Sequence, residues 1–436
     1  MVIPGMARFL ASILLAAALL SPPAIAAGDH AAGPPQAPAL PSPSLHIRGG
    51  LWFDGSGFRP MEWYAVGGKL TAARPARVDA VIDLAGRHVL PPLAEAHNHD
   101  MQNAFTARMM AGRYLARGIF YSAQMAAAAR DVAPFRGLLG GPGAVDAVFA
   151  NAVISASDGH PLAMALESYE AEGMKASADD IRDNAFWSVD TPADLDARWE
   201  RIAASRPSLI KVILIDGANY AANRRKPELF GRNGIDPALL PEIVRRGHGI
   251  GARIVVHVDT AEDFRIAVAA GADIIGHLPG YRIAEGKTAA DYRIADAAIA
   301  EAARRGTAVV TTTAASRYAI ERRPESAKPI LETYADNIRR LRAAGVRLAL
   351  GSDVFGGSVV DEIETVDRLG VIPRPELLRI ATADTARLLF PERRIGAFEE
   401  GAEASLIAVD GDPARDLSAL RRVMLAVKQG ELLSGR

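Results

Sequence analysis

The chain has 436 residues, of which 49% are hydrophobic and 23% charged, and its formal net charge is −1. This length is sufficient for one large barrel with an accessory domain, or for two or three ordinary domains. The near-neutral charge and the lack of a basic run with interleaved aromatic residues argue against a nucleic-acid partner. Because the sequence contains no cysteine, disulfides and thiolate metal ligands are excluded, and any metal must be held by nitrogen and oxygen.

The N-terminal segment has the order of features that export signals share. Arg8 is followed by the apolar run Phe9 to Leu20 and then by the small-residue triplet Ala24-Ile-Ala26. This order predicts a secretory signal peptide over residues 1–26, since the apolar core is short for a membrane span. The Ala- and Pro-rich composition that follows predicts a flexible linker over residues 27–44. We therefore expect an exported protein, periplasmic or secreted, with no membrane segment after cleavage.

Both ends of the remaining chain are rich in short strands bounded by glycine turns. The pattern occupies residues 45–88, as in Trp63-Tyr-Ala-Val-Gly-Gly, and returns in residues 391–436, as in Leu406-Ile-Ala-Val-Asp-Gly. Alternating apolar residues between Gly-containing turns are typical of antiparallel strands. Since the segment between them has a different pattern, we expect one small β-sandwich domain formed by both chain ends.

Residues 89–390 alternate short apolar strands with Ala-, Arg- and Glu-rich helical stretches, which is the pattern of parallel βα units. Eight such units predict a (β/α)₈ barrel. An open doubly wound sheet is the alternative, but no G-x-G-x-x-G follows the first strand. The eight expected strands are Val89 to Ala96, Ile119 to Ser122, Val148 to Ile154, Leu209 to Ile215, Arg253 to Val258, Asp273 to His277, Ala308 to Thr312 and Arg347 to Gly351.

Residues able to bind a metal stand at the ends of these strands. His97-Asn-His99 closes the first strand, and because residues i and i+2 share a face, both imidazoles leave it on one side. Lys211 lies within the fourth strand, His257 and His277 end the fifth and sixth, and Asp353 follows the eighth. Each has an ordinary structural interpretation alone, as a snorkelling lysine, a buried histidine or a helix cap. Together, at the barrel face where active sites lie, they favour a metal site.

With these residues in place, the chain resembles the amidohydrolase superfamily, and in particular its members with a binuclear metal centre and a carboxylated lysine. The resemblance extends from about Leu45 to Leu433. The segments that carry it are Val81 to Pro91, His257 to Glu262, Ala267 to His277, Gly351-Ser-Asp353, Thr382 to Arg387 and Gly401 to Pro413. The opening motif departs from the usual Pro-Gly-Leu-Ile-Asp-Ala-His, since here Pro92-Leu-Ala-Glu95-Ala precedes His97. Glu95 shares the strand face of His97. It is therefore either a residue that supports the histidine ligands or a buried acid that pairs with a group elsewhere in the barrel.

The resemblance implies a ligand set for two divalent metal ions, with zinc as the first choice for nitrogen and oxygen ligands. His97, His99 and Asp353 would hold one ion, and His257 and His277 the other. Lys211 would bridge both after reacting with CO₂, because its carbamate is an anionic oxygen ligand whereas an ammonium repels cations.

The resemblance also implies the chemistry, which is hydrolysis by a hydroxide that bridges the metals, with Asp353 as general base and then general acid. His160, in Ser157-Asp-Gly-His160-Pro, resembles the Gly-Gly-His segment of the imidazolonepropionase-like and peptidase-like branch, where the histidine contacts the substrate carbonyl or oxyanion. Asp158 and Pro161 depart from that segment, so a loop-structuring role stands beside the catalytic one. Tyr220 and Tyr281-Arg282 lie on loops expected near the site, with packing roles favoured.

We therefore expect an exported metal-dependent hydrolase that cleaves a carbon–nitrogen bond, amide or peptide, in a small substrate such as a dipeptide or N-acyl amino acid. The alternative within enzymes is a lactone, ester or cyclic-amide hydrolase at the same centre. A deaminase is disfavoured, because those members use one metal and lack the bridging lysine. The alternative of another class is a non-catalytic periplasmic ligand-binding protein, against which the complete ligand set argues. A homo-oligomer is compatible with the sequence.

Overall fold

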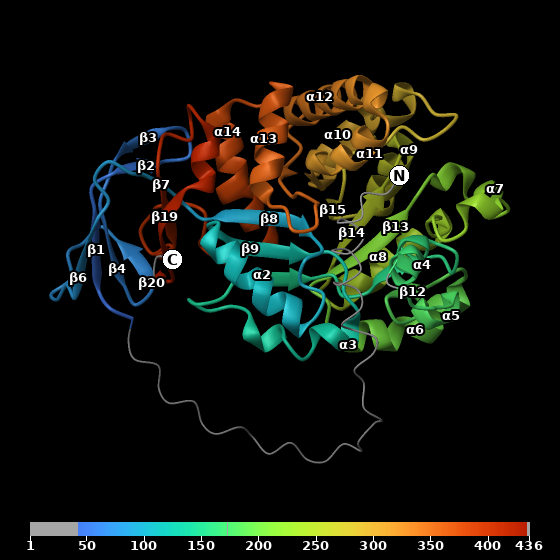
Figure 1. The fold of residues 1–436 in the computed structure, drawn as a ribbon, viewed down its shortest axis with the longest axis horizontal. Coiled ribbons are helices and arrows are strands. Elements are labelled where there is room, and N and C mark those ends of the chain that lie inside the picture. The colour runs from blue at the N-terminus through green and yellow to red at the C-terminus, as the bar shows by residue number, and fades with distance from the viewer. Residues whose placement is uncertain (1–41, 172, 434–436) are drawn as a thin grey trace, which may run out of the picture.

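The computed structural model of the protein describes residues 42–171 and 173–433. The predicted signal peptide and most of the predicted linker, residues 27–44, lie outside the described residues. A set of short strands drawn from both chain ends lies beside a larger α/β body (Figure 1). Among the residues described, no helix combines the length and apolar character needed to cross a bilayer.

The smaller part consists of two sheets that enclose an apolar core. A four-stranded sheet has the order β5-β4-β1-β6, and a six-stranded sheet has the order β20-β19-β18-β7-β2-β3. The six-stranded sheet joins the two chain ends, because β18 pairs antiparallel with β7. Ile47, Trp52 and Leu406 are among the buried side chains of the shared core. The strands are β1 Leu45–Arg48, β2 Leu51–Phe53, β3 Phe58–Pro60, β4 Trp63–Val66, β5 Lys69–Thr71, β6 Ala80–Asp83, β7 His88–Leu90, β18 Leu406–Val409, β19 Val423–Lys428 and β20 Glu431–Leu433.

The larger body is built on parallel strands, in a three-stranded sheet β10-β9-β8 and a seven-stranded sheet β12-β11-β13-β14-β15-β16-β17. Backbone hydrogen bonds also connect the ends of the first and last strands: Ala96 N donates to Leu350 O, and Asp353 N donates to His97 O, both at 2.9 Å. The strands are β8 Leu93–Asn98, β9 Ile119–Gln124, β10 Asp146–Phe149, β11 Val153–Ser155, β12 Phe186–Ser188, β13 Leu209–Leu214, β14 Arg253–Val258, β15 Ile274–Ile275, β16 Ala308–Val310 and β17 Leu348–Ala349. The predicted α/β fold with parallel strands is confirmed.

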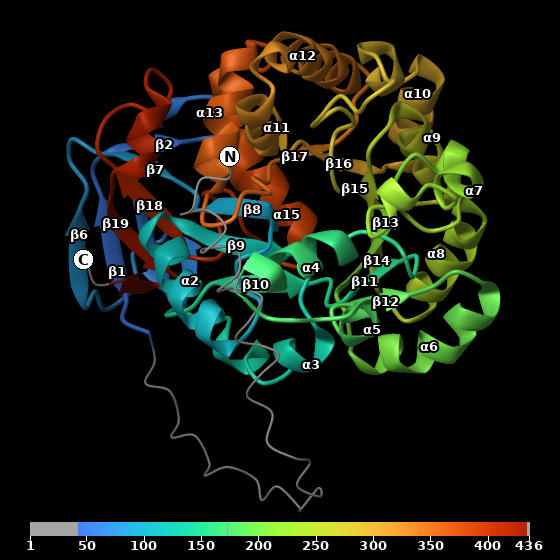
Figure 2. The same ribbon diagram turned by 45° about the vertical axis from the view of Figure 1, so that its right-hand side comes forward.

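Helices follow these strands and cover them from outside; α8, α9, α10 and α12 lie outside β14 to β16 in Figure 2. Most of the longer helices have signals that fix their ends. Thr260 Oγ1, for example, caps α9 by accepting from Asp263 N, and Gly271 ends that helix with a positive φ. The helices are α2 Ala104–Ala116, α3 Ala129–Val132, α4 Leu162–Ala171, α5 Ala178–Ile181, α6 Pro192–Ala204, α7 Tyr220–Asn223, α8 Leu240–Gly249, α9 Ala261–Ala270, α10 Asp296–Arg305, α11 Arg317–Arg322, α12 Ala327–Ala343, α13 Val359–Leu369, α14 Arg374–Arg379 and α15 Thr385–Leu389.

Two of the expected strands are divided. The strand expected over Val89 to Ala96 is interrupted at Pro91-Pro92, which lack the N–H groups a ladder needs, so β7 joins the β-domain and β8 the parallel sheet. The strand expected over Val148 to Ile154 is interrupted around Asn151, whose φ is 52°. The Asn151 amide donates to Ser205 O at 2.9 Å, and this contact stabilises the left-handed turn between β10 and β11.

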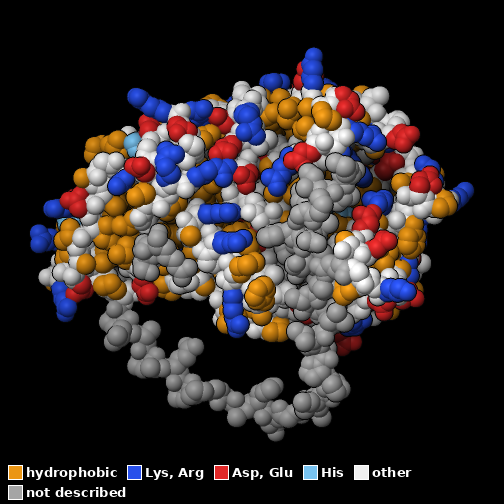
Figure 3. Space-filling view, in the orientation of Figure 1, with side chains coloured by type: hydrophobic (Ala, Val, Ile, Leu, Met, Phe, Trp, Pro, Cys, Tyr) orange, Lys and Arg blue, Asp and Glu red, His pale blue; other side chains and the backbone are white. Residues whose placement is uncertain are grey.

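Charged side chains of both signs are interspersed over the face shown in Figure 3. This mixture agrees with the small formal net charge of the chain. Apolar side chains on the same face lie between charged ones.

Candidate metal centre

The structure brings five of the predicted ligands into one cluster, in which the three residues His97, His257 and His277 are buried and the other two, His99 and Asp353, are half-buried. His97 Nε2 lies 3.6 Å and His99 Nε2 3.1 Å from Asp353 Oδ1, so the first and last strands of the parallel body meet here. His277, after β15, places its ring centroid 4.4 Å from that of His97. The ring of His257, at the end of β14, has its centroid 4.5 Å from that of His277. One potential ligand atom each of His97, His277 and Asp353 lies within 4.8 Å of the others.

Each of three imidazoles has one nitrogen bound to a protein oxygen and the other nitrogen left available. His97 Nδ1 lies 2.9 Å from Gly276 O, and a carbonyl can only accept, so Nδ1 carries the proton and Nε2 the lone pair. His257 Nε2 lies 2.9 Å from Asp259 Oδ1, which leaves Nδ1. His277 Nδ1 lies 3.1 Å from Thr312 Oγ1, which leaves Nε2. Such oxygen partners orient metal-binding histidines and increase their basicity.

Lys211 lies at the centre of the cluster, on β13. Its Nζ is 3.0 Å from His97 Nε2 and 3.4 Å from His277 Nε2. In the described part of the chain no carboxylate lies within ion-pair distance of this amine. Burial lowers the pKa of Lys211 to about 8. A buried amine of low pKa is neutral in a larger fraction of molecules, and the neutral amine is the form that reacts with CO₂.

These residues fit a metal centre. The free nitrogens of His97 and His277 both face Lys211. Asp353 is a carboxylate near neutral pH. Burial acts to raise its pKa, but the charges of His97, His99 and Lys211 outweigh burial and hold the pKa well below the usual value. The donor set contains imidazole nitrogen and carboxylate oxygen, which suits zinc and related divalent ions.

Asp259 is a supporting residue that the sequence analysis missed. It is buried and contacts both His257 and Arg282, whose Nη2 lies 3.3 Å from Asp259 Oδ2. Burial acts to raise its pKa, but the hydrogen bond and charge of His257 and the charge of Arg282 bring the pKa to about 2. The available signal was its position two residues after His257, which places both side chains on one face of the strand end.

Thr312 is a second supporting residue that was not singled out. It has a φ of 45°, and the residues around it are held by Glu362 of α13. The Glu362 carboxylate accepts from Thr313 N at 2.9 Å and Ala314 N at 2.6 Å. This anchoring holds the Thr312 hydroxyl against His277.

Glu95 acts on the backbone that carries the ligands. Its Oε1 accepts from His97 N at 3.1 Å and from Ser352 N at 2.8 Å, so it links the ends of β8 and β17. Gly351 permits the same close approach, because a Cβ at this position would lie 2.5 Å from His97 N. Of the two interpretations left open for Glu95, this geometry supports that of a supporting partner.

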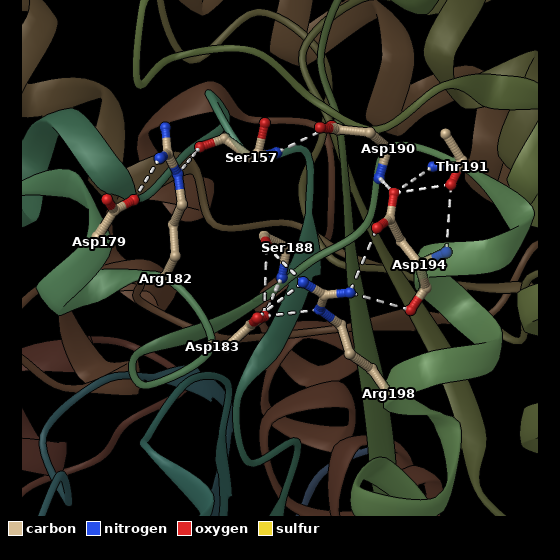
Figure 4. A network of polar contacts seen from close by, with 9 residues as sticks. All are labelled: Ser157, Asp179, Arg182, Asp183, Ser188, Asp190, Thr191, Asp194 and Arg198. Atoms are coloured by element: carbon tan, nitrogen blue, oxygen red, sulfur yellow. Dashed lines mark hydrogen bonds and ion pairs between the residues drawn. The ribbon is translucent and has the colours of Figure 1, made fainter.

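His160 lies next to the cluster, with its ring stacked on that of His257 at a centroid distance of 5.8 Å. Burial, followed by the charge of His257, lowers the pKa of His160 to about 3, so its ring is neutral near pH 7. The start of its loop is fixed at Ser157, whose N–H donates to Asp190 at 3.0 Å and whose carbonyl accepts from Arg182 at 2.6 Å, as seen in Figure 4.

The aromatic residues expected near the site are divided between two places. Tyr281 lies beside the cluster, with its ring centroid 6.4 Å from that of His257. Tyr220 accepts through its hydroxyl from Arg224 Nη1 at 2.9 Å, within the polar network that also holds Asp190. Tyr281 is therefore the better placed of the two to meet a substrate.

Comparisons with known proteins bear on the family and the fold of the chain. Residues 218–432 match the model of the amidohydrolase family, so the predicted family resemblance and the prediction of a hydrolase acting on carbon–nitrogen bonds are confirmed. A search of curated proteins found no match.

Solved structures with the same fold extend the comparison to nearly the whole chain. An Xaa-Pro dipeptidase with methionine bound in its active site is 21% identical, with a TM-score of 0.70 over 90% of this chain and 100% of that one. Ochratoxinase of A. niger is 18% identical, with a TM-score of 0.70 over 91% and 96%. Molinate hydrolase is 16% identical, with a TM-score of 0.66 over 91% and 95%. At these identities the likeness establishes the fold alone.

Proposed function

We propose that this protein is an exported hydrolase that cleaves the amide or peptide bond of a small substrate, such as a dipeptide or an N-acyl amino acid. The observation that carries the proposal is the group of potential ligands around the buried Lys211, which consists of His97, His99, His257, His277 and Asp353. The similar structures include a dipeptidase and other hydrolases, which supports small amides as the substrate class. The hydrogen bonds between the ends of β8 and β17 support a closed (β/α)₈ barrel as the scaffold.

We infer that two divalent ions, with zinc as the first choice, are held by these five side chains and by Lys211 as a carbamate. When bound, such ions supply a water of lowered pKa and polarise a substrate carbonyl. The ammonium of Lys211 first loses one proton; the neutral amine then forms a bond to the carbon of CO₂ and releases a second proton, which leaves an anionic oxygen ligand where a cation stood among imidazoles. This conversion removes the repulsion that an ammonium would impose.

The chain's own residues then handle protons and charge. Asp353, held as a carboxylate, takes a proton from the attacking water and delivers it to the leaving nitrogen, so that water is added across the carbon–nitrogen bond. His160, neutral and fixed beside His257, is placed to donate a hydrogen bond to the oxygen that becomes negative. Asp259 and Thr312 keep the rings of His257 and His277 in the required orientation.

The test is hydrolysis of dipeptide and N-acyl amino acid libraries by the protein purified with bicarbonate and without chelator. We expect turnover that chelator abolishes and that zinc or another divalent ion restores. Turnover of esters or lactones with none of amides would replace the substrate class by the alternative one. Ligand binding without turnover of any of these substrates would favour the binding-protein alternative.

A further inference from the structure

A concave site lies at the opposite ends of the strands from the metal cluster. A hollow of about 620 Å³ is lined by the start of β14, the start of β15, the turn after α10 and part of α15. Arg253 in this lining and His257 in the cluster are four residues apart on β14, which separates them by roughly 13 Å. The site is therefore distinct from the predicted catalytic one. We call it the arginine hollow, since Arg253, Arg305, Arg347 and Arg387 all line it.

Three of these arginines contact backbone carbonyls and have no acidic partner among the described residues. Arg253 donates to the carbonyls of Leu388 and Leu389 at the end of α15, Arg347 to Gly306 O, and Arg387 Nε to Ile395 O. In the described part of the chain no carboxylate lies within ion-pair distance of any of the three. Each guanidinium has five N–H donors, so most of their donors are not used by the protein. Carbonyl contacts of this kind fix the side chains without neutralising them.

The acidic groups of the region do not cancel this charge. Asp273 also lines the hollow; its Oδ2 lies 2.8 Å from His248 Nε2 and accepts from Ile254 N at 2.7 Å, and among the described residues no arginine lies within ion-pair distance of it. Arg305 pairs with Glu301 outside the lining. Burial lowers the pKa of Arg253; the charges of Asp273 and Glu392 act to raise it, and the charge of Arg347 acts to lower it.

The neighbouring hollow provides an internal comparison. It has a volume of about 440 Å³ and shares Arg347 and Arg387 with the first. Its own arginines are neutralised, because Arg342 pairs with Glu376 and Arg379 with Asp384, each at 2.5 Å. The two hollows therefore share two unpaired arginines, and the third, Arg253, lines the arginine hollow and not its neighbour.

We propose that the arginine hollow binds a small tetrahedral oxyanion of the phosphate or phosphate-ester class. Guanidinium groups bind such anions through paired N–H donors, and the fixed positions of these side chains reduce the ordering cost of binding. The volume is in the range of small-molecule sites, so it has room for an organic group attached to the phosphate. The bound anion would offset the mutual repulsion of Arg253 and Arg347.

The test is calorimetric titration of the metal-loaded protein with inorganic phosphate and with phenyl phosphate at low ionic strength. We expect saturable binding of one anion that weakens about tenfold in Arg347→Gln and about a hundredfold in the double variant Arg347→Gln/Arg387→Gln. Arg368→Gln is the matched control, since Arg368 is an exposed arginine of α13 that forms no ion pair with any residue the structure describes and does not line the hollow. This control should bind like the wild type. Tighter binding of phenyl phosphate would identify an ester as the ligand, and equal binding the free anion.

Three results would overturn the proposal. These are no saturable binding by the wild type, unchanged affinity in the double variant, or an equal loss in Arg368→Gln. Phosphate held at the metal cluster would give the second result. If Arg347→Gln does not fold, Arg347→Lys keeps the charge but loses the guanidinium fork, and we expect it to bind more weakly than the wild type and more tightly than the Arg387→Gln/Arg347→Lys double variant.

Discussion

Lys211 and Lys428 are both buried lysines, yet their surroundings differ in kind. Lys428 Nζ donates to Gly141 O and to Ala144 O and pairs with Asp146 Oδ1 at 3.0 Å. Lys211 Nζ instead faces the ring nitrogens of His97 and His277. Lys428 is a buried cation whose hydrogen-bond donors have acceptors, as a structural lysine requires. The surroundings of Lys211 suit an amine that reacts with CO₂ and then binds metal. Our functional proposal rests on this difference.

The largest effect is expected from Lys211→Ala. Loss of the bridging group should remove bound metal and reduce amide hydrolysis by at least about a thousandfold. Formate or propionate should partly restore both, because a short carboxylate can occupy the place of the carbamate. Metal content measured by elemental analysis, with Lys428→Met as the control for loss of a buried lysine, tests this expectation. Unchanged metal in Lys211→Ala would contradict it.

Asp353→Asn is expected to reduce kcat by about 10² to 10⁴, since it removes the proton acceptor and donor while keeping the shape of the side chain. Steady-state kinetics on a substrate found by the library screen provides the measurement. Asp296→Asn, at an exposed aspartate paired with Arg340, should leave kcat unchanged. Activity of Asp353→Asn equal to that of the wild type would exclude the assigned role.

Lys428→Met should act on folding and not on the metal centre. It removes one partner of a buried ion pair, although Asp146 keeps Arg393 at 2.8 Å. We expect a loss of about 3 kcal/mol in the free energy of unfolding, measured by urea denaturation. The folded fraction should bind metal as the wild type does. If Lys428→Met were as stable as the wild type but bound no metal, Lys428 would be needed for metal binding as Lys211 is. That result would contradict the assignment of different roles to the two lysines.

The sequence allowed the cluster to be predicted because its members stand at the ends of apolar strands, where a period-two pattern and strand order determine which residues meet. Asp259 and Thr312 were missed because their roles depend on contacts made after folding, with Arg282, 23 positions along the chain, and with His277. The two divided strands differ in this respect. The break at Pro91-Pro92 could be seen in the sequence, whereas the turn at Asn151 depends on a contact with Ser205 that forms on folding.

Asp259→Ala tests one of these missed residues. It removes the acceptor that orients His257, and we expect metal affinity to fall about tenfold to a hundredfold. Competition with a chromogenic chelator would measure the change. Glu262→Ala is a suitable control, because Glu262 lies nearby on α9 and pairs with Arg265 away from the cluster. Equal affinities for Asp259→Ala and the wild type would show that His257 is oriented without it.

The pH dependence of CO₂ capture offers a smaller and more specific contrast. The pKa of Lys211 is lowered by burial to about 8, so the neutral amine fraction increases as pH rises through this value. Labelling of the metal-free protein with ¹³C-bicarbonate, followed by NMR, should therefore give more carbamate at pH 9 than at pH 7. Lys428 should remain unlabelled at both values, because its amine is held by three acceptors. Labelling that decreases with pH would contradict this assignment.

Elemental analysis of the protein purified with bicarbonate and without chelator tests the central claim most directly. We predict about two divalent transition-metal ions per chain, and fewer in Lys211→Ala. One ion per chain in both proteins would contradict a lysine-bridged pair of metals. No metal after reconstitution with zinc, manganese, cobalt and iron would contradict the metal centre itself.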